Sequence, residues 1–193
     1  MHKVLDFIKK NKQFSFFLLL VILLALITIF APVIAPQDPY ASDLKNALQP
    51  PSSAHWFGTD KLGRDIFSRV IYASRSSLPA TLILVVLIFA IGTLLGTLAG
   101  YFGGWIDAVI MRISDMMISF PGMVLAIAVA GIMGASVKNA VIAVAVVSWP
   151  KYARLARSLV MKIRHEDYIY AAIVTGSKTS YILRKYMLPN IIP

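Results

Sequence analysis

The length of the apolar runs limits the fold of this chain more than any other feature. Four segments of the 193 residues are dominated by apolar side chains, and each is close to or above the roughly 20 residues that a helix needs to cross a bilayer. They run over residues 14–35, 78–102, 106–134 and 139–160. Only 15% of the residues are charged, against about 25% in an average soluble domain. We therefore expect an all-α fold, a polytopic bundle of four spanning helices.

Basic residues are placed unevenly around these runs. Residues 151–185 hold eight Lys or Arg against two acids, whereas the loop over residues 36–77 holds five against four. Four crossings return the chain to its starting side. The positive-inside rule therefore predicts that the basic segment 1–13 and the loop 161–190 are both cytoplasmic, and that loop 36–77 is external.

The first apolar run has an alternative interpretation as a cleaved signal peptide, because Ala31 to Ala35 loosely resembles a cleavage region. The run exceeds the about 7–15 residues of a signal-peptide core, which favours an uncleaved first helix.

The second half of loop 36–77 has a helical pattern of its own. Apolar residues recur at helical spacing over Asp60 to Ser74, with charged residues between them. This pattern predicts an amphipathic helix that lies in the membrane interface. A solvated connector is the alternative.

Glycine and proline mark two further features of the predicted spans. Gly92, Gly96 and Gly100 lie four residues apart and are expected to let a neighbouring helix pack closely. Pro121 and Gly122 predict a kink in the third span, whose membrane core we place from Met116 onward. The kink could gate a pathway or serve packing alone.

Charged residues precede that core. Arg112 and Asp115 have the i, i+3 spacing of an ion pair at the start of the third span.

The sequence offers no constellation for catalysis, cofactor binding or metal binding. It has no cysteine, and His2, His55 and His165 are far apart. Lys178 follows Gly176 and Ser177 but lacks the two glycines of a phosphate-binding loop. The net charge of +10 lies beside apolar runs, which is typical of headgroup contact with a lipid bilayer and not of nucleic-acid binding. We therefore expect a protein that is not an enzyme.

The predicted cytoplasmic loop carries a patterned face. Its small and aromatic residues at i, i+3, i+4 and i+7 spacing predict a short helix with one flat face. These residues are Tyr168, Ala171, Ala172 and Thr175. Gly176 is expected to cap this helix in a left-handed conformation. Ser177 is expected to cap a second helix over Lys178 to Tyr186.

This loop resembles the coupling loop of bacterial ABC importer permeases. That loop has Glu-Ala-Ala, three residues, Gly and a later hydrophobic-Pro pair. The matching positions here are Tyr170, Ala171, Ala172, Gly176, Leu188 and Pro189, so Tyr170 replaces the usual Glu.

Other segments resemble the peptide and nickel group within that family. The first is residues 57–69, with Gly58, Thr59, Asp60, Gly63, Arg64 and Asp65. Phe120-Pro121 and Tyr152-Ala153-Arg154 are also in register.

The resemblance implies a permease subunit that moves di- or oligopeptides, or nickel, into the cytoplasm across the bacterial cell membrane. It implies as partners a second permease subunit, two cytoplasmic ABC ATPase subunits and an extracytoplasmic substrate-binding protein, the last acting near loop 36–77. The ATPases would dock around residues 167–176. The positions expected to contact them are Asp167, Tyr168, Tyr170, Ala171, Ala172, Gly176, Leu188 and Pro189.

The family fold normally continues with two more spanning helices. Residues 78–193 therefore correspond to an incomplete permease core, and we expect a C-terminally truncated chain. The alternatives are a nickel-specific permease, a non-transporting membrane scaffold, and a channel or secondary carrier. A proton-coupled carrier is disfavoured because the predicted spans hold no pair of carboxylates.

Overall fold

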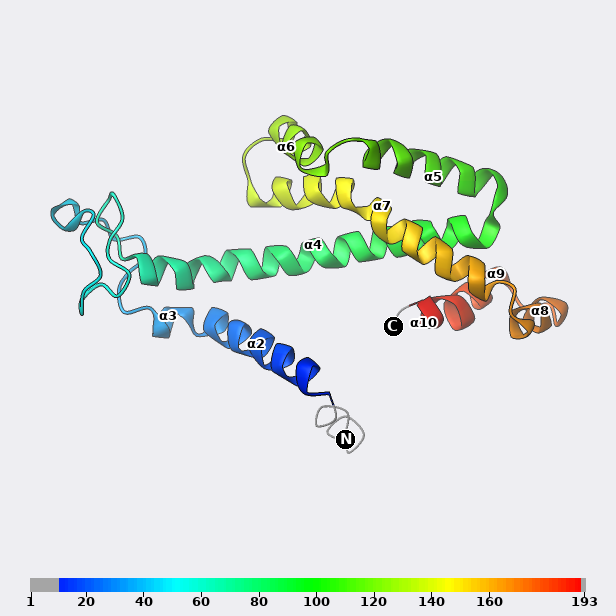
Figure 1. Cartoon of the computed structure of the whole chain (residues 1–193), viewed down its shortest axis with the longest axis horizontal. Helices are drawn as coiled ribbons and strands as arrows, with labels where there is room; N and C mark the ends of the chain where they lie inside the picture. The colour runs from blue at the N-terminus through cyan, green and yellow to red at the C-terminus, as the bar shows by residue number, and fades with distance from the viewer. Residues whose placement is uncertain (1–10, 192–193) are drawn as a thin grey trace. The chain divides into compact units, whose positions relative to one another are not determined.

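The computed structural model describes residues 11–191, and their regular elements are helices apart from one isolated bridge between Thr59 and Asp65. The helices are labelled in Figure 1. In chain order they are α2 (Lys12–Ile29), α3 (Ala31–Ile34), the 3-10 turn η1 (Leu44–Asn46), α4 (Ile66–Phe102), α5 (Gly104–Ser119), α6 (Gly122–Met133), α7 (Val137–Ile163), α8 (Asp167–Val174), α9 (Thr179–Ile182), the π-helical turn η2 (Leu183–Met187) and α10 (Leu188–Ile191). The expected all-α fold is confirmed. Of the expected cytoplasmic segment 1–13, residues 1–10 lie outside the described part of the chain.

The chain divides into two compact units at Pro79. In the first unit, α2 is apolar on every side and none of its residues is buried, as expected of a helix whose solvent is lipid. α2 ends at Phe30, and α3 begins with a proline in its first turn. The Thr28 hydroxyl donates to the Ser74 hydroxyl at 3.1 Å and joins α2 to the first turns of α4.

The separate interfacial helix expected over residues 60–74 is not present. Residues 60–65 form turns, and α4 then runs unbroken for 37 residues through Ser77, the expected end of the external loop. The start is fixed by Asp65, whose carboxylate accepts a hydrogen bond from the Ser68 N–H at 2.8 Å and so caps the helix. Pro79 lies inside α4 without ending it.

The third expected span is two helices and not one kinked helix. α5 and α6 meet at an angle of 95°. Phe120, between them, has an extended backbone, since the following proline disfavours a helical conformation there. Pro121 and Gly122 therefore stand at a sharp break.

Two helices, α2 and α4, are long and apolar enough to cross a membrane, and α5 with α6 is a third candidate if the bent pair counts as one span. This count covers residues 11–191. α7 carries Lys151, Arg154 and Arg157 in its C-terminal half. Four crossings remain a prediction.

The last helices form a compact group on the C-terminal end of α7. We call residues 167–191 the C-terminal knob. Its core is a cluster of buried apolar side chains from α7, α8, α9, η2 and α10: Ala156, Val160, Ile169, Ala172, Ile182, Met187 and Ile191. The π-helical turn precedes Pro189, which has no N–H to donate to the Lys185 carbonyl.

Ile169→Ala should open the knob. Ile169 is fully buried, and losing such a side chain costs about 2–5 kcal/mol. Trypsin should therefore cut after Lys178, between α8 and α9, at least about tenfold faster than in the unchanged chain. Val174→Ala is the control, because Val174 is 86% exposed. Equal digestion of the two variants would contradict this account of the core.

Candidate functional site

α8 carries the residues that the sequence marks for docking, and a complete cap ends it. Gly176 has φ of +78°, the left-handed conformation expected of it. The Gly176 N–H donates to the Ile173 carbonyl and the Ser177 N–H donates to the Ala172 carbonyl, both at 3.0 Å. These two bonds form a Schellman motif, which stops the helix and turns the chain sharply.

Ser177 does not cap the second helix, so that expectation is wrong. Lys178 holds the N-cap position of α9, with no side-chain hydrogen bond to the helix start. The physical reason is that Ser177 still belongs to the C-cap of α8, so the residue that directly precedes α9 is the next one, Lys178. One extended residue follows before α9 begins.

The outer face of α8 differs by one residue from the expected flat face. Ala172 is 6% exposed and packs inward with Ile169, so Ala172 is not on the surface. The other three expected residues, Tyr168, Ala171 and Thr175, are exposed. A second set at the same i, i+3, i+4 and i+7 spacing is also exposed, and it consists of Asp167, Tyr170, Ala171 and Val174. We call these four the exposed α8 face.

Several other expected docking residues lie beside this face. Tyr168 is 42% exposed, and its ring lies 6.0 Å from that of Tyr186. Leu188 is half-buried and Pro189 is exposed, both in α10. The Tyr170 hydroxyl lies 3.1 Å from Nδ1 of His165, which precedes α8.

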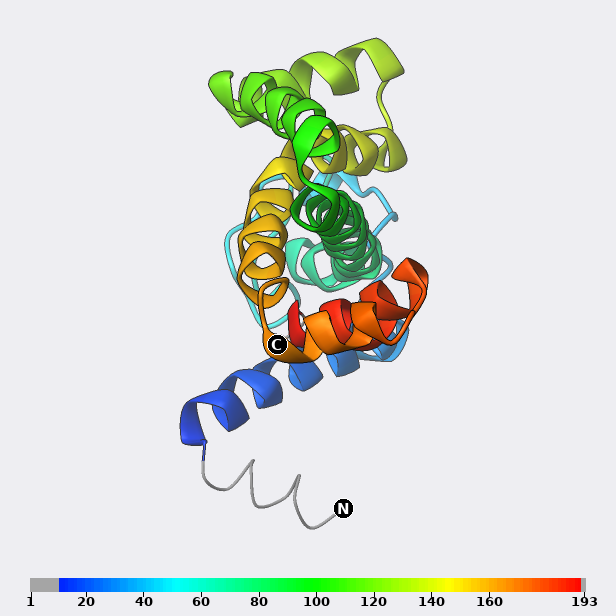
Figure 2. The same cartoon turned by 90° about the vertical axis from the view of Figure 1, so that its right-hand side faces the viewer.

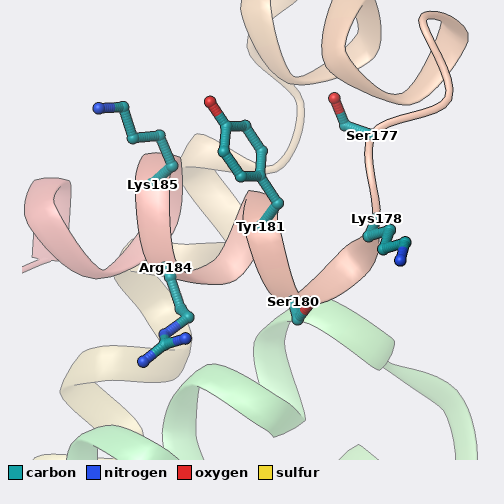
Figure 3. A pocket seen from close by; sticks show the side chains of 6 residues that line it. All are labelled: Ser177, Lys178, Ser180, Tyr181, Arg184 and Lys185. Carbon is teal, nitrogen blue, oxygen red and sulfur yellow. The ribbon is translucent and has the colours of Figure 1, made fainter.

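The knob also has a basic hollow that the sequence pattern does not predict. It has a volume of about 770 Å³ and is lined by Ser177, Lys178, Ser180, Tyr181, Arg184 and Lys185. Figure 3 shows Arg184 pointing to the side of the helix opposite Lys185 and Tyr181. The charged groups of Arg184 and Lys185 therefore lie on different sides of the helical segment formed by α9 and η2 and do not converge on one ligand position.

α4 and α7 approach each other closely along the glycine stripe Gly92, Gly96 and Gly100 (Figure 2). A Cβ atom at Gly96 would lie 2.3 Å from the Ala153 carbonyl oxygen and 2.8 Å from the Ala156 Cβ. The corresponding closest distances are 2.5 Å at Gly92 and 2.9 Å at Gly100. No side chain fits at these positions while the two helices stay in contact.

Two ion pairs join α5 to α7. Arg154 pairs with Asp115, and Arg157 pairs with Asp107. The expected pair between Arg112 and Asp115 is therefore replaced by a pair across helices. Arg154 also reaches Ser114, with Nε 3.4 Å from the hydroxyl oxygen. The Asp115 carboxylate pairs with Arg154 of the facing helix and not with Arg112 of its own helix.

The motif of residues 57–69 shapes the loop before α4. Gly58 and Gly63 have φ of +73° and +71°. A Cβ atom would lie 2.3 Å from the Gln49 carbonyl oxygen at the first and 1.7 Å from the Asp43 carbonyl oxygen at the second. Thr59 joins two segments of this loop, because its hydroxyl accepts a hydrogen bond from the Gln49 N–H at 2.8 Å.

Two carboxylates complete this structure. The hydrogen bond from the Arg64 side chain, with those from the Arg64 and Leu62 N–H groups, lowers the pKa of Asp60 to about 2. Burial acts to raise the pKa of Asp65, but hydrogen bonds from Ser68 and His55 outweigh it and lower that pKa. Both groups are therefore ionised at neutral pH and hold the loop and the helix start.

Among residues 11–191, no group of three or more His, Cys, Asp or Glu side chains is arranged to hold a metal ion.

Comparison with known proteins shows two family matches. Residues 92–193 match the binding-protein-dependent transport system inner membrane component. Residues 2–51 match the N-terminal TM domain of oligopeptide transport permease C.

Individual relatives are similar over most of this chain. A dipeptide transport system permease protein of Alkalihalophilus pseudofirmus is 44% identical over 183 residues, which is 95% of this chain and 60% of the relative. A probable D,D-dipeptide transport system permease protein of Escherichia coli is 45% identical over 90% of this chain and 58% of the relative. A nickel transport system permease protein of Escherichia coli is 37% identical over 91% of this chain and 64% of the relative. The chain spans about three fifths of the length of these relatives.

Gly96→Ala should separate α4 from α7 and lower the free energy of unfolding by about 1–3 kcal/mol, the usual cost of an overpacked contact. Thermal unfolding in detergent measures the loss. Gly131→Ala is the matched control, since its new methyl group meets nothing within 4 Å. It should leave the midpoint unchanged or raise it slightly, because alanine favours helix by up to about 1 kcal/mol. A Gly96→Ala variant as stable as Gly131→Ala would refute the close contact.

Proposed function

Because the chain belongs to the family of inner membrane components of binding-protein-dependent transport systems, we propose that it is the permease subunit of an ATP-driven importer of dipeptides or oligopeptides. Relatives named for dipeptide or glutathione transport are 39–46% identical, and relatives named for nickel transport are 37% identical. These values favour a peptide over nickel as the substrate. The proposed location is the bacterial cell membrane.

The observation that carries the proposal is the exposed α8 face on a knob whose own core is closed. Tyr170 is 51% exposed and Val174 is 86% exposed, although an aromatic and an aliphatic side chain of this size are usually covered by protein or lipid. A folded knob with uncovered aromatic and aliphatic side chains suits a groove on a partner protein. The proposed partner is a cytoplasmic ATPase, one for each of two paired permease subunits.

α7 would carry the motion of the ATPases to the other helices. Ala156 and Val160 of α7 belong to the core of the knob, and the same two residues contact the glycine stripe of α4. On the same stretch of α7, Arg154 and Arg157 bind α5. A displacement of α8 would therefore reach α4 and α5 through directly packed side chains, provided that the ATPase contacts the knob differently in its two states.

The rest of the proposed arrangement follows the charge pattern of the sequence. The N-terminus and the knob are cytoplasmic, α7 is the fourth crossing, and the loop before α4 is external, where a substrate-binding protein would deliver its cargo. The break at Pro121 and Gly122 is the proposed gate.

Tyr170→Ala should weaken ATPase binding about tenfold or more, because large aromatic side chains at the centre of an interface contribute most of its binding energy. The measurement is the amount of ATPase that copurifies with membranes containing the whole transporter, together with ATP-dependent uptake. Tyr181→Ala is the matched control, since Tyr181 is 49% exposed but lies on α9. Unchanged ATPase retention in Tyr170→Ala would defeat the docking proposal.

The orientation has a separate test with a membrane-impermeant amine reagent. In intact cells, Lys45 and Lys61 should react, whereas Lys178 and Lys185 should react only after the membrane is opened. All four lysines are exposed, so accessibility of the side chain does not bias the result. Labelling of Lys178 in intact cells would show that the proposed topology is inverted.

A further inference from the structure

A cavity of about 420 Å³ lies beside the first turns of α4 in the first unit. Two tyrosines and two arginines, Tyr40, Arg69, Tyr72 and Arg75, form most of its polar lining, and we call them the Tyr–Arg pocket. An adjoining cavity of about 340 Å³ shares Tyr40 and Tyr72 and extends to the end of α3. No residue of the proposed ATPase-docking surface contributes to either cavity.

The two rings of this pocket have a fixed arrangement. The Tyr40 and Tyr72 ring centroids lie 6.2 Å apart with an interplanar angle of 80°, an edge-to-face contact. The guanidinium carbon of Arg75 lies 5.7 Å from the Tyr72 ring centroid. A cation over an aromatic face is stabilised without losing its charge.

The two arginines differ in what they contact. Arg69 donates to the Pro39 carbonyl at 3.3 Å and lies 3.5 Å from the Asp60 carboxylate. Arg75 has no carboxylate partner in the described part of the chain and is exposed. The Arg75 guanidinium is therefore available to an anion from outside the chain.

The pocket lies where the apolar stretches of the first unit end. Thr28, in the last turn of α2, bonds to Ser74, the residue before Arg75. The long apolar run of α4 begins at Leu78. Tyrosine and arginine at such a boundary belong to the headgroup layer of a membrane.

We propose that the Tyr–Arg pocket binds the phosphate group of a phospholipid. The planar guanidinium of Arg75 fits two phosphate oxygens at once, and the tyrosine hydroxyls can donate to the same group. Pro32 of α3 lines the adjoining cavity. Ile29, at the end of α2, and Val33 and Ile34, in α3, are 67%, 83% and 42% exposed and offer an apolar surface to acyl chains. That surface favours a lipid over a free phosphate or a peptide carboxylate as the ligand.

The test is native mass spectrometry of the detergent-purified chain titrated with dioleoyl phosphatidylglycerol. Arg75→Gln should weaken lipid retention about tenfold, since it removes the charge-assisted hydrogen bonds. Lys61→Gln is the matched control, because it removes one charge from an exposed lysine of the same unit outside the pocket. Equal retention in Arg75→Gln and the unchanged chain would overturn the proposal, as would an equal loss in Lys61→Gln.

A second variant guards against misfolding of the first. Tyr72→Phe keeps the ring contacts and removes only a hydroxyl, so it should weaken retention about threefold without changing the thermal midpoint in lipid-free detergent. Unchanged retention in Tyr72→Phe together with an unfolded Arg75→Gln would also reject the site. Inorganic phosphate and an N-acetylated dipeptide form the remaining arms. Displacement of the lipid by either at equal concentration would show that the pocket binds a free anion and not a lipid.

Discussion

The close contact of α4 with α7 is the constraint on which the second unit depends. The contact needs a bare backbone at Gly92, Gly96 and Gly100, because the carbonyl of Ala153 occupies the space of a side chain at Gly96. Lipid tails are as apolar as leucine, so helices in a membrane gain little from burying large side chains and much from close packing. Once α4 and α7 are in contact, α7 offers its other sides to α5, α6 and the knob.

The apolar runs and the spacing of small residues predict much of this arrangement. The helices, the C-cap at Gly176 and the position of the break at Pro121 follow from local chemistry, which a sequence carries directly. The angle of that break and the partner of Asp115 do not, because they depend on which helix lies opposite. For the same reason one of the four residues expected on the surface of α8 is buried. A pattern of small residues does not reveal that Ala172 is covered by the chain itself.

The residues that resemble the peptide and nickel group have a different character from the knob. Gly58, Gly63, Asp60 and Asp65 allow tight turns, saturate backbone N–H groups and cap α4. Such residues are recognisable in sequence because few others fit their backbone conformations and hydrogen bonds. These four residues determine the shape of the loop before α4, whereas the exposed side chains around them determine what the loop can bind.

The break between α5 and α6 has a consequence for what surrounds it. Pro121 cannot donate to the Met117 carbonyl, and the extended backbone at Phe120 interrupts the helical bonds on both sides. The Ser119 hydroxyl donates a hydrogen bond to the Met116 carbonyl at 2.7 Å. At membrane depth, hydrocarbon cannot solvate the carbonyl oxygens that are left, so this corner requires water or another polypeptide against it.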